Sequence, residues 1–407
     1  MFCGIDLLFA GQAAALRRRL RNSKVGCLTH AAAVDRRGIR TLEVLEELGA
    51  SYSVIFSPEH GLDGVAQAQE SVPHDAGQIA SRLGSRIISL YGSDRESLAP
   101  SDDSLSETDL LVIDLVDIGS RFYTYAWTAW MTIQVAARRG IHTVILDRPN
   151  PISGDPATLE GKPQNKDHLS FVGLEPLPIR HALTIGELLC YLASEAGLPL
   201  GAQGALSVVR PAGWERHRTA HAWGRPFVNP SPNIPTLETA IVYPGACLLE
   251  GTNLSEGRGT TLPFQTAGAP FIDAERLASD LLSQGVPGAW VRPVSFRPTF
   301  DKYANEVCHG VMIHVTDPAI FRPVATYMAL VALAHAQAGD RFQFLSQVYE
   351  FETTRQAFDL LTGSSEARRA ILDGGRVADV VQMVAPVDSN WRSMVTESEL
   401  RADSATA

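Results

Sequence analysis

The first 210 residues alternate between short apolar runs and longer segments whose apolar residues have helical spacing. The short runs, rich in Val, Ile and Leu, fall at 24–29, 52–56, 86–90, 109–115, 142–146 and 205–210. Helical spacing occurs at 41–48, 122–139 and 184–196. Continuous apolar runs separated by helices are typical of buried parallel strands with helical crossovers. The pattern therefore predicts an α/β fold with a doubly wound, Rossmann-like sheet in the N-terminal part.

The pattern changes at residues 225–235, where four of eleven residues are proline. Such a segment cannot lie inside a helix or a central strand, so it predicts a linker or rigid loop. Beyond it, strand-like runs at 239–248 and 307–315 and helical spacing at 320–338 predict a smaller α+β domain. We therefore expect a Rossmann-like domain over 1–228, a smaller domain over 229–395 and a polar, disordered tail over 396–407.

The composition is that of an ordinary globular protein, with 45% hydrophobic and 20% charged residues among 407. The net charge of −10 disfavours nucleic acid as a partner, because phosphate backbones are also anionic. No apolar stretch reaches the ~18 residues of a membrane span. Asp6 falls where a signal peptide would have its basic region. We therefore expect a cytoplasmic protein with neither a nucleic-acid nor a membrane partner.

Polar side chains follow the predicted strands at the edge where open α/β sheets bind ligands. In chain order they are His30, Glu59, His60, Asp114, Asp117, Arg121, Tyr123 and Arg148. A sheet without a site would have ordinary turn residues at these places. The pattern favours a functional crevice, and the alternative is a set of solvated loops.

Glu59 lies between Pro58 and the pair His60-Gly61, directly after an apolar run. Pro58 restricts the backbone that leads into it, and Gly61 permits a tight turn. A partly desolvated carboxyl group at this place has a raised pKa, which suits a general acid. The alternative is a carboxylate at a helix N-terminus that accepts backbone N–H groups.

The other candidates have simple structural alternatives. Asp114 and Asp117 can cap the next helix, and Arg121 can pair with either of them or bind an anionic ligand bidentately. His30 and His60 are candidate ligands or acid–base groups, although a lone loop histidine is usually neither.

The second domain contributes a loop at 250–261 in which three glycines are interleaved with polar residues, including Glu256 and Arg258. This composition predicts a polar binding loop, with a flexible surface loop as the alternative. No P-loop, His-Glu-x-x-His, dinucleotide-binding glycine motif or Gly-x-Ser-x-Gly is present. The five cysteines are widely spaced and include no Cys-x-x-Cys pair. We therefore expect no cofactor, no metal and no disulfide framework.

Several longer motifs resemble those of the NamZ-type exo-β-N-acetylmuramidases. They are, in order, 56–62 (FSPEHGL), 114–125, 146–151 (LDRPNP), 171–173, 180–181, 184–188 (TIGEL), 230–233 (PSPN), 243–245 and 250–260. The resemblance implies a Rossmann-like domain and a smaller C-terminal domain with the active site in the cleft between them. It also implies hydrolytic release of N-acetylmuramic acid from the non-reducing ends of peptidoglycan fragments, with Glu59 as the catalytic glutamate of the Pro-Glu-His-Gly motif.

The chain departs from the family pattern at three positions. His30 stands where asparagine is usual, Val116 where glutamine is usual and Ala182 where glycine is usual. The first two departures bear on the preferred substrate side group. They also motivate an alternative function, a non-catalytic protein that binds muropeptides or amino sugars. A nucleotide-dependent oxidoreductase is a weaker alternative, because the glycine-rich loop is missing.

Most glycosidases use two carboxyl groups, and we expect Glu59 to be the acid. The second carboxylate is left open among Asp114, Asp117 and Glu256. Muramic acid carries a lactyl carboxylate, which an arginine can bind, and the candidates are Arg121, Arg148 and Arg258. We expect His60, Tyr123 and Asn233 to position the hydroxyl or acetamido groups. In the cytoplasm, such an enzyme would recycle imported cell wall fragments.

Overall fold

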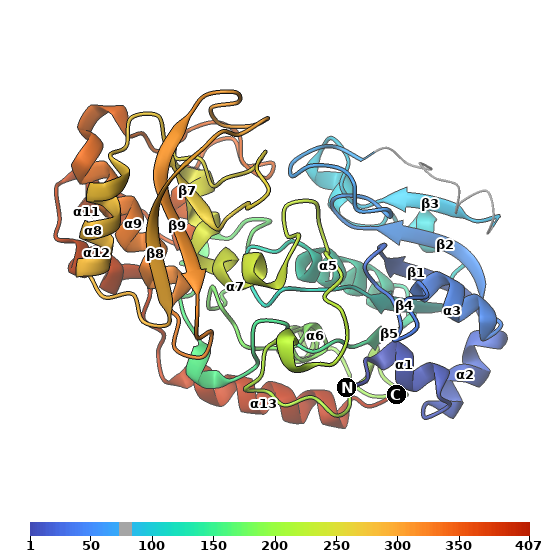
Figure 1. Ribbon diagram of the computed structural model, residues 1–407. Helices are drawn as coiled ribbons and strands as arrows, with labels where there is room; N and C mark the ends of the chain where they lie inside the picture. Colours follow the sequence, from blue (N-terminus) through green and yellow to red (C-terminus); the bar gives the residue numbers. More distant parts are fainter. Residues whose placement is uncertain (73–83) are drawn as a thin grey trace.

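The computed structural model describes residues 1–72 and 84–407, and the chain forms two lobes built on different sheets (Figure 1). The N-terminal lobe has a six-stranded sheet in the order β3-β2-β1-β4-β5-β6. Its strands are β1 (Lys24–Thr29), β2 (Ser51–Ser57), β3 (Arg86–Ser89), β4 (Leu110–Asp114), β5 (His142–Leu146) and β6 (Leu206–Val209). All five strand pairings are parallel, which confirms the predicted doubly wound α/β fold.

Helices cover both faces of this sheet. One core contains α1 (Gly4–Phe9), α2 (Ala14–Arg21) and α3 (Thr41–Glu47), and the other contains α5 (Tyr125–Arg138) and α6 (Ile185–Glu195). Successive residues of β4 alternate between the two cores, so that Leu110 and Val112 lie in one and Leu111 and Ile113 in the other. Burial on both faces explains why the strands have continuous apolar sequences.

The C-terminal lobe has a three-stranded antiparallel sheet in the order β7-β9-β8, which confirms the predicted smaller α+β part. Its elements are α7 (Leu237–Ala246), β7 (Thr266–Ala269), α8 (Ala274–Ser283), β8 (Ala289–Phe296), β9 (Cys308–Val315), α9 (Pro323–Ala338), α10 (Ala357–Thr362), α11 (Glu366–Leu372) and α12 (Val377–Val384). The boundary between 228 and 229 stays a prediction.

The run at 239–248 is helical, so the strand predicted there is wrong. The Thr236 side chain caps α7 by accepting a hydrogen bond from the Thr239 N–H at 3.2 Å. Nine of the ten residues of α7 are buried. A helix that is buried nearly all round has no polar face, so its sequence shows no helical period and resembles a buried strand.

The disordered tail predicted for 396–407 is also wrong, because these residues belong largely to α13 (Asn390–Ser404). This helix packs against α6, and its chain end returns to the N-terminal lobe, where both termini lie close together (Figure 1). Ser398, Ala402 and Ala405 are buried in that contact. The N–H of Ala407 donates to the carbonyl of Val208 in β6 at 3.0 Å, so the chain end extends the sheet edge.

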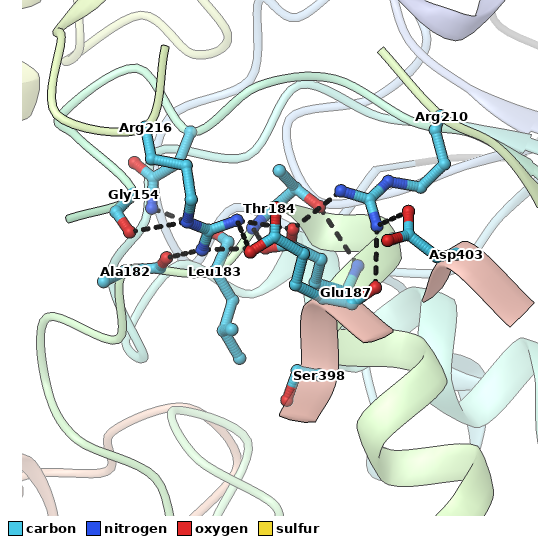
Figure 2. A network of polar contacts seen from close by, with 12 residues as sticks. Gly154, Ala182, Leu183, Thr184, Glu187, Arg210, Arg216, Ser398 and Asp403 are labelled. Atoms are coloured by element: carbon cyan, nitrogen blue, oxygen red, sulfur yellow. Dashed lines mark hydrogen bonds and ion pairs between the residues drawn. The ribbon is translucent and has the colours of Figure 1, made fainter. Parts of the chain in front are cut away.

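Figure 2 shows the polar network that anchors α6 and α13. Thr184 and Glu187 form a capping box at the start of α6. The fully buried Glu187 carboxylate also accepts hydrogen bonds from Arg210 at 3.0 Å and Arg216 at 2.6 Å. Arg210 in turn reaches Asp403 of α13 at 2.9 Å. The Thr-Ile-Gly-Glu motif therefore stabilises the packing of these helices.

No helix among residues 1–72 and 84–407 is long and apolar enough to cross a membrane.

Candidate active site

A polar cavity, which we call the inner cavity, lies between the lobes and has about 30 Å³ of free volume. The N-terminal lobe and the proline-rich segment contribute Glu59, His60, Tyr123, Thr124, Ser231 and Asn233. The C-terminal lobe contributes Tyr243, Glu250, Arg258, Phe264, Tyr349 and Glu350. The wall therefore carries three carboxyl groups and one guanidinium group.

Glu59 follows β2 at a turn in which His60 and Gly61 both have positive φ, 70° and 80°. Its side chain is only 5% exposed. One carboxylate oxygen accepts a hydrogen bond from the Thr124 hydroxyl at 2.7 Å, and the other accepts from the Gln69 N–H at 3.2 Å. Thr124 is the N-cap residue of α5. The Glu59 carboxyl group is therefore held by two donors next to the N-terminus of α5.

Glu350 is the second carboxyl group that faces Glu59 in the cavity wall, and the sequence did not indicate it. It is 8% exposed, has a positive φ of 48° and accepts a hydrogen bond from the Tyr91 hydroxyl at 2.9 Å. Burial, and then the negative charge of Glu59, raise the pKa of Glu350 well above its usual range. Glu350 therefore holds a proton under conditions in which an exposed glutamate is ionised.

A second, more open cavity of about 300 Å³, the outer cavity, adjoins the inner one. The two share Ala68, Glu250, Arg258 and Tyr349 in their walls. The Arg258 guanidinium ion-pairs with Glu250 and, at 2.9 Å, with Glu256. The loop at 250–261 thus supplies a wall between the cavities.

Glu256 lines the outer cavity and not the inner one. Its second carboxylate oxygen accepts a hydrogen bond from Lys302 at 2.9 Å. Burial favours a raised pKa for Glu256, but the cations of Lys302 and Arg258 outweigh it and lower the pKa. With both oxygens held by cations, Glu256 is an ionised structural carboxylate, which corrects its assignment as a catalytic candidate.

Three of the expected positioning residues line the inner cavity. The Nδ1 of His60 donates to the Ala66 carbonyl at 2.8 Å, so Nδ1 carries a proton. The Asn233 side-chain amide donates to the side-chain oxygen of Gln67 at 2.8 Å. The Tyr123 ring packs against Tyr125 with 4.7 Å between centroids.

Asp114 and Arg148 lie outside both cavities described above, which corrects their assignment to the site. They form a buried bidentate ion pair, with Arg148 Nε and Nη2 at 2.5 and 2.9 Å from the two Asp114 oxygens. The Thr41 hydroxyl also donates to Asp114, at 2.5 Å. Each charge is therefore neutralised by the other inside the N-terminal lobe.

His30 and Asp117 also lie outside the inner cavity. His30 Nε2 accepts the Val116 N–H at 3.0 Å, and burial lowers the pKa of His30 to about 3, so this histidine is neutral. Asp117 accepts the Gly119 N–H at 2.6 Å, and burial raises the pKa of Asp117 to about 7. The two departures at 30 and 116 therefore contact each other behind the site and do not face the inner cavity.

Arg121 is a connector between the lobes, which corrects its assignment as an anion receptor. Its buried guanidinium donates to the carbonyls of Lys162, Leu177 and Leu361 at 3.1, 3.0 and 2.5 Å. Leu361 belongs to α10 of the C-terminal lobe. Of the three candidate arginines, Arg258 alone lines the inner cavity.

Within the described ranges, no group of three or more His, Cys, Asp or Glu side chains is arranged to hold a metal ion.

Known proteins match this chain along nearly its whole length. Family models described as "Exo-beta-N-acetylmuramidase NamZ, N-terminal" and "C-terminal" match residues 25–238 and 241–400. The peptidoglycan β-N-acetylmuramidase NamZ of Bacillus subtilis (strain 168) is 36% identical over 379 residues, which cover 93% of this chain and 86% of that protein.

Two crystal structures from Bacteroides fragilis NCTC 9343, both of DUF1343 family proteins, share the fold. The first has a TM-score of 0.81 and 27% identity, and covers 99% of this chain and 97% of its own. The second has a TM-score of 0.67 and 24% identity, with coverage of 100% and 98%. Both family models and the Bacillus relative agree, and the chain belongs to the NamZ family of exo-β-N-acetylmuramidases.

Proposed function

We propose that this glycoside hydrolase releases N-acetylmuramic acid from the non-reducing ends of peptidoglycan fragments, with Glu59 and Glu350 as its catalytic pair. The observation that carries the proposal is the pair itself, one carboxyl group from each lobe in the wall of one buried cavity. Most glycosidases cleave with two carboxyl groups, of which one is protonated and the other ionised. The family and the Bacillus relative supply the reaction class.

The proposed cleavage needs one carboxyl group as a proton donor and the other as a carboxylate. Glu350 is kept protonated and donates its proton to the glycosidic oxygen as the bond to the leaving sugar breaks. Glu59 accepts hydrogen bonds from the Thr124 hydroxyl and the Gln69 N–H, and as the partner carboxylate it stabilises the positive charge that develops at the anomeric carbon. Water then adds to the anomeric carbon and gives up a proton to Glu350, which returns the site to its starting state. This proposal moves the acid role from Glu59 to Glu350.

Arg258 and Asn233 are proposed to recognise the muramic acid ring. Arg258 uses Nε and Nη2 in its ion pairs, and its Nη1 donates to no described residue, so it can bind the lactyl carboxylate. The Asn233 amide currently binds the side-chain amide oxygen of Gln67, the same type of acceptor as the carbonyl of an acetamido group. The inner cavity holds roughly one or two water molecules, so its wall must open before a sugar can enter.

A non-catalytic binding function is disfavoured, because the departures that motivated it lie outside the inner cavity while both carboxyl groups are present. We also propose that the protein acts in the cytoplasm in cell wall recycling. All five cysteines are buried free thiols, as in proteins of reducing compartments. Fractionation of cells would test the location, and recovery of the protein in the medium or the wall fraction would contradict it.

The proposed activity is tested with a disaccharide of N-acetylmuramic acid β-linked to N-acetylglucosamine. The wild type should release free N-acetylmuramic acid, and Glu59→Gln should not. A disaccharide with N-acetylglucosamine at the non-reducing end is the control, because it lacks the lactyl carboxylate, and its cleavage should be at least tenfold slower. Absence of release by the wild type, or full activity of Glu59→Gln, would refute the proposal.

A further inference from the structure

The outer cavity begins where a leaving sugar would emerge from the inner one. Glu250, Arg258 and Tyr349 form walls of both cavities, and Tyr349 directly precedes Glu350. A glycosidic oxygen that receives the Glu350 proton therefore lies near the boundary between them. The volume of about 300 Å³ is at the lower end of small-molecule pockets, which is enough for a single sugar unit.

The wall of the outer cavity offers an aromatic face and neutral amides. The Phe300 ring is 39% exposed and lies in the cavity wall. Gln67, Gln69 and Gln347 line the same cavity and bring amide donors and acceptors. An exposed ring beside amide groups suits a pyranose, which has apolar C–H faces and a rim of hydroxyl groups.

The lysine of this cavity, Lys302, is already fully engaged within the wall. All three donors of the Lys302 ammonium are used, by Glu256 at 2.9 Å and by the carbonyls of Leu249 and Leu254 at 3.0 and 3.1 Å. Asp301, at 38% exposure, is the most exposed carboxylate of this cluster. A leaving group with carboxylates, such as a peptide-bearing muramic acid, would meet the Asp301 charge and no available lysine. The free Nη1 of Arg258 is assigned to the lactyl carboxylate of the ring in the inner cavity.

The backbone is held in an unfavourable conformation around both cavities. Five of the ten described non-glycine residues with positive φ line them, namely His60, Phe264 and Glu350 in the inner cavity and Gln69 and Asp301 in the outer one. Such conformations cost about 1–3 kcal/mol each and cluster at functional sites. The strain therefore marks the outer cavity as part of the same site.

The glycine-rich loop fixes the position of the aromatic wall. The Gly259 carbonyl accepts the Thr299 N–H at 2.9 Å and the Thr299 hydroxyl at 2.8 Å. A Cβ atom at Gly259, which has φ 76°, would lie 2.7 Å from the Phe300 nitrogen. The loop can therefore approach Phe300 this closely only because residue 259 is glycine.

From this arrangement we infer that the ring of the uncharged leaving sugar packs on Phe300 in the outer cavity. The inference rests on the proposed function and adds to it the residue that holds the leaving sugar. Phe300 is a specificity-determining residue in this account and takes no part in bond cleavage.

The test compares Phe300→Ala on two substrates of the wild-type reaction. One is the muramic acid–N-acetylglucosamine disaccharide, and the other is N-acetylmuramyl β-fluoride, whose leaving group is a single atom and leaves the outer cavity empty. For Phe300→Ala we expect KM for the disaccharide to rise about tenfold while the fluoride kinetics stay within twofold. Phe300→Tyr, which keeps the ring, should behave as the wild type.

Trp290→Ala is the matched control, because Trp290 is an aromatic residue of the same lobe, 72% exposed and outside both cavities. Trp290→Ala should leave the kinetics on both substrates unchanged. Equal effects of Phe300→Ala on both substrates, or an unchanged disaccharide KM, would overturn the inference and leave the proposed function intact. If the wild type cleaved neither substrate, the proposed function would fail and this inference with it.

Discussion

Replacing Glu350 by glutamine separates the two carboxyl roles. Gln has the shape of a protonated glutamate, and its carbonyl can still accept the Tyr91 hydroxyl. Because burial and the charge of Glu59 raise the pKa of Glu350 well above its usual range, the wild-type side chain holds a proton where an exposed glutamate is ionised. The substitution therefore leaves the charge and the packing of the cavity nearly unchanged, and removes only the transferable proton.

The expected loss of kcat in Glu350→Gln follows from the proposed role of Glu350 as general acid. General acid catalysis contributes about 10²–10⁴-fold, or roughly 3–5 kcal/mol, when the leaving oxygen needs a proton. Glu350→Gln should lose this factor in kcat on the muramic acid–N-acetylglucosamine disaccharide. On 4-nitrophenyl N-acetylmuraminide, whose leaving group departs as a stable anion, kcat should fall less than about tenfold. Glu59→Gln should lose activity on both substrates.

Initial rates on both substrates measure the contrast, and urea unfolding of each variant shows whether the fold is retained. The reasoning is refuted if a folded Glu350→Gln loses both activities equally. Retention of disaccharide activity within threefold of the wild type would refute it as well.

Three further predictions concern stability. Asp114→Ala should lower the free energy of unfolding in urea by about 3–5 kcal/mol, because Arg148 is then left buried without its partner, and the added substitution Arg148→Met should recover part of the loss. Folding raises the pKa of Asp117 from 3.8 to about 7, so its stabilising contribution is complete below pH 3.8 and is lost as the pH rises through 7, at most about 4 kcal/mol. Asp117→Asn should flatten this part of the stability curve, and an unchanged slope would contradict the assignment. Deletion of 390–407 should cost at least about 3 kcal/mol, since Met394 and Val395 of α13 are buried, and an unchanged melting temperature would contradict the packing role of the helix.

Much of the N-terminal lobe is readable from the sequence because its strands are buried on both faces. The strand cores are rich in aliphatic residues, and residues 110–113 form a continuous aliphatic run. The helices between them have the ordinary amphipathic period, and only parallel strands need such crossovers. Local pattern and global topology therefore agree, and the predicted doubly wound sheet follows from them.

The two wrong elements have opposite causes. Residues 239–248 look like a strand because α7 is buried nearly all round and shows no helical period. The tail looks disordered because α13 is mostly polar, and only a narrow stripe that includes Ser398 and Ala402 contacts the N-terminal lobe. In both cases the environment that decides the structure is supplied by residues far away in the chain.

Some residues of the site could be predicted from the sequence and others could not. Glu59 and Arg258 lie in motifs with glycine or proline, where the sequence shows that the backbone is constrained. Glu350 has no such neighbour, and its burial and proximity to Glu59 exist only when the lobes are packed together. Asp114 and Arg148 look catalytic because they follow strands, but their pairing across adjacent strands is not encoded by any local pattern.

The central claim is that the glycosidic bond is cut between Glu59 and Glu350. A crystal structure of Glu59→Gln bound to the muramic acid–N-acetylglucosamine disaccharide tests it most directly. We predict the muramic acid ring in the inner cavity, its anomeric carbon facing residue 59, and the glycosidic oxygen within hydrogen-bonding distance of Glu350. A disaccharide bound elsewhere, or one whose glycosidic oxygen lies out of reach of Glu350, would contradict the account.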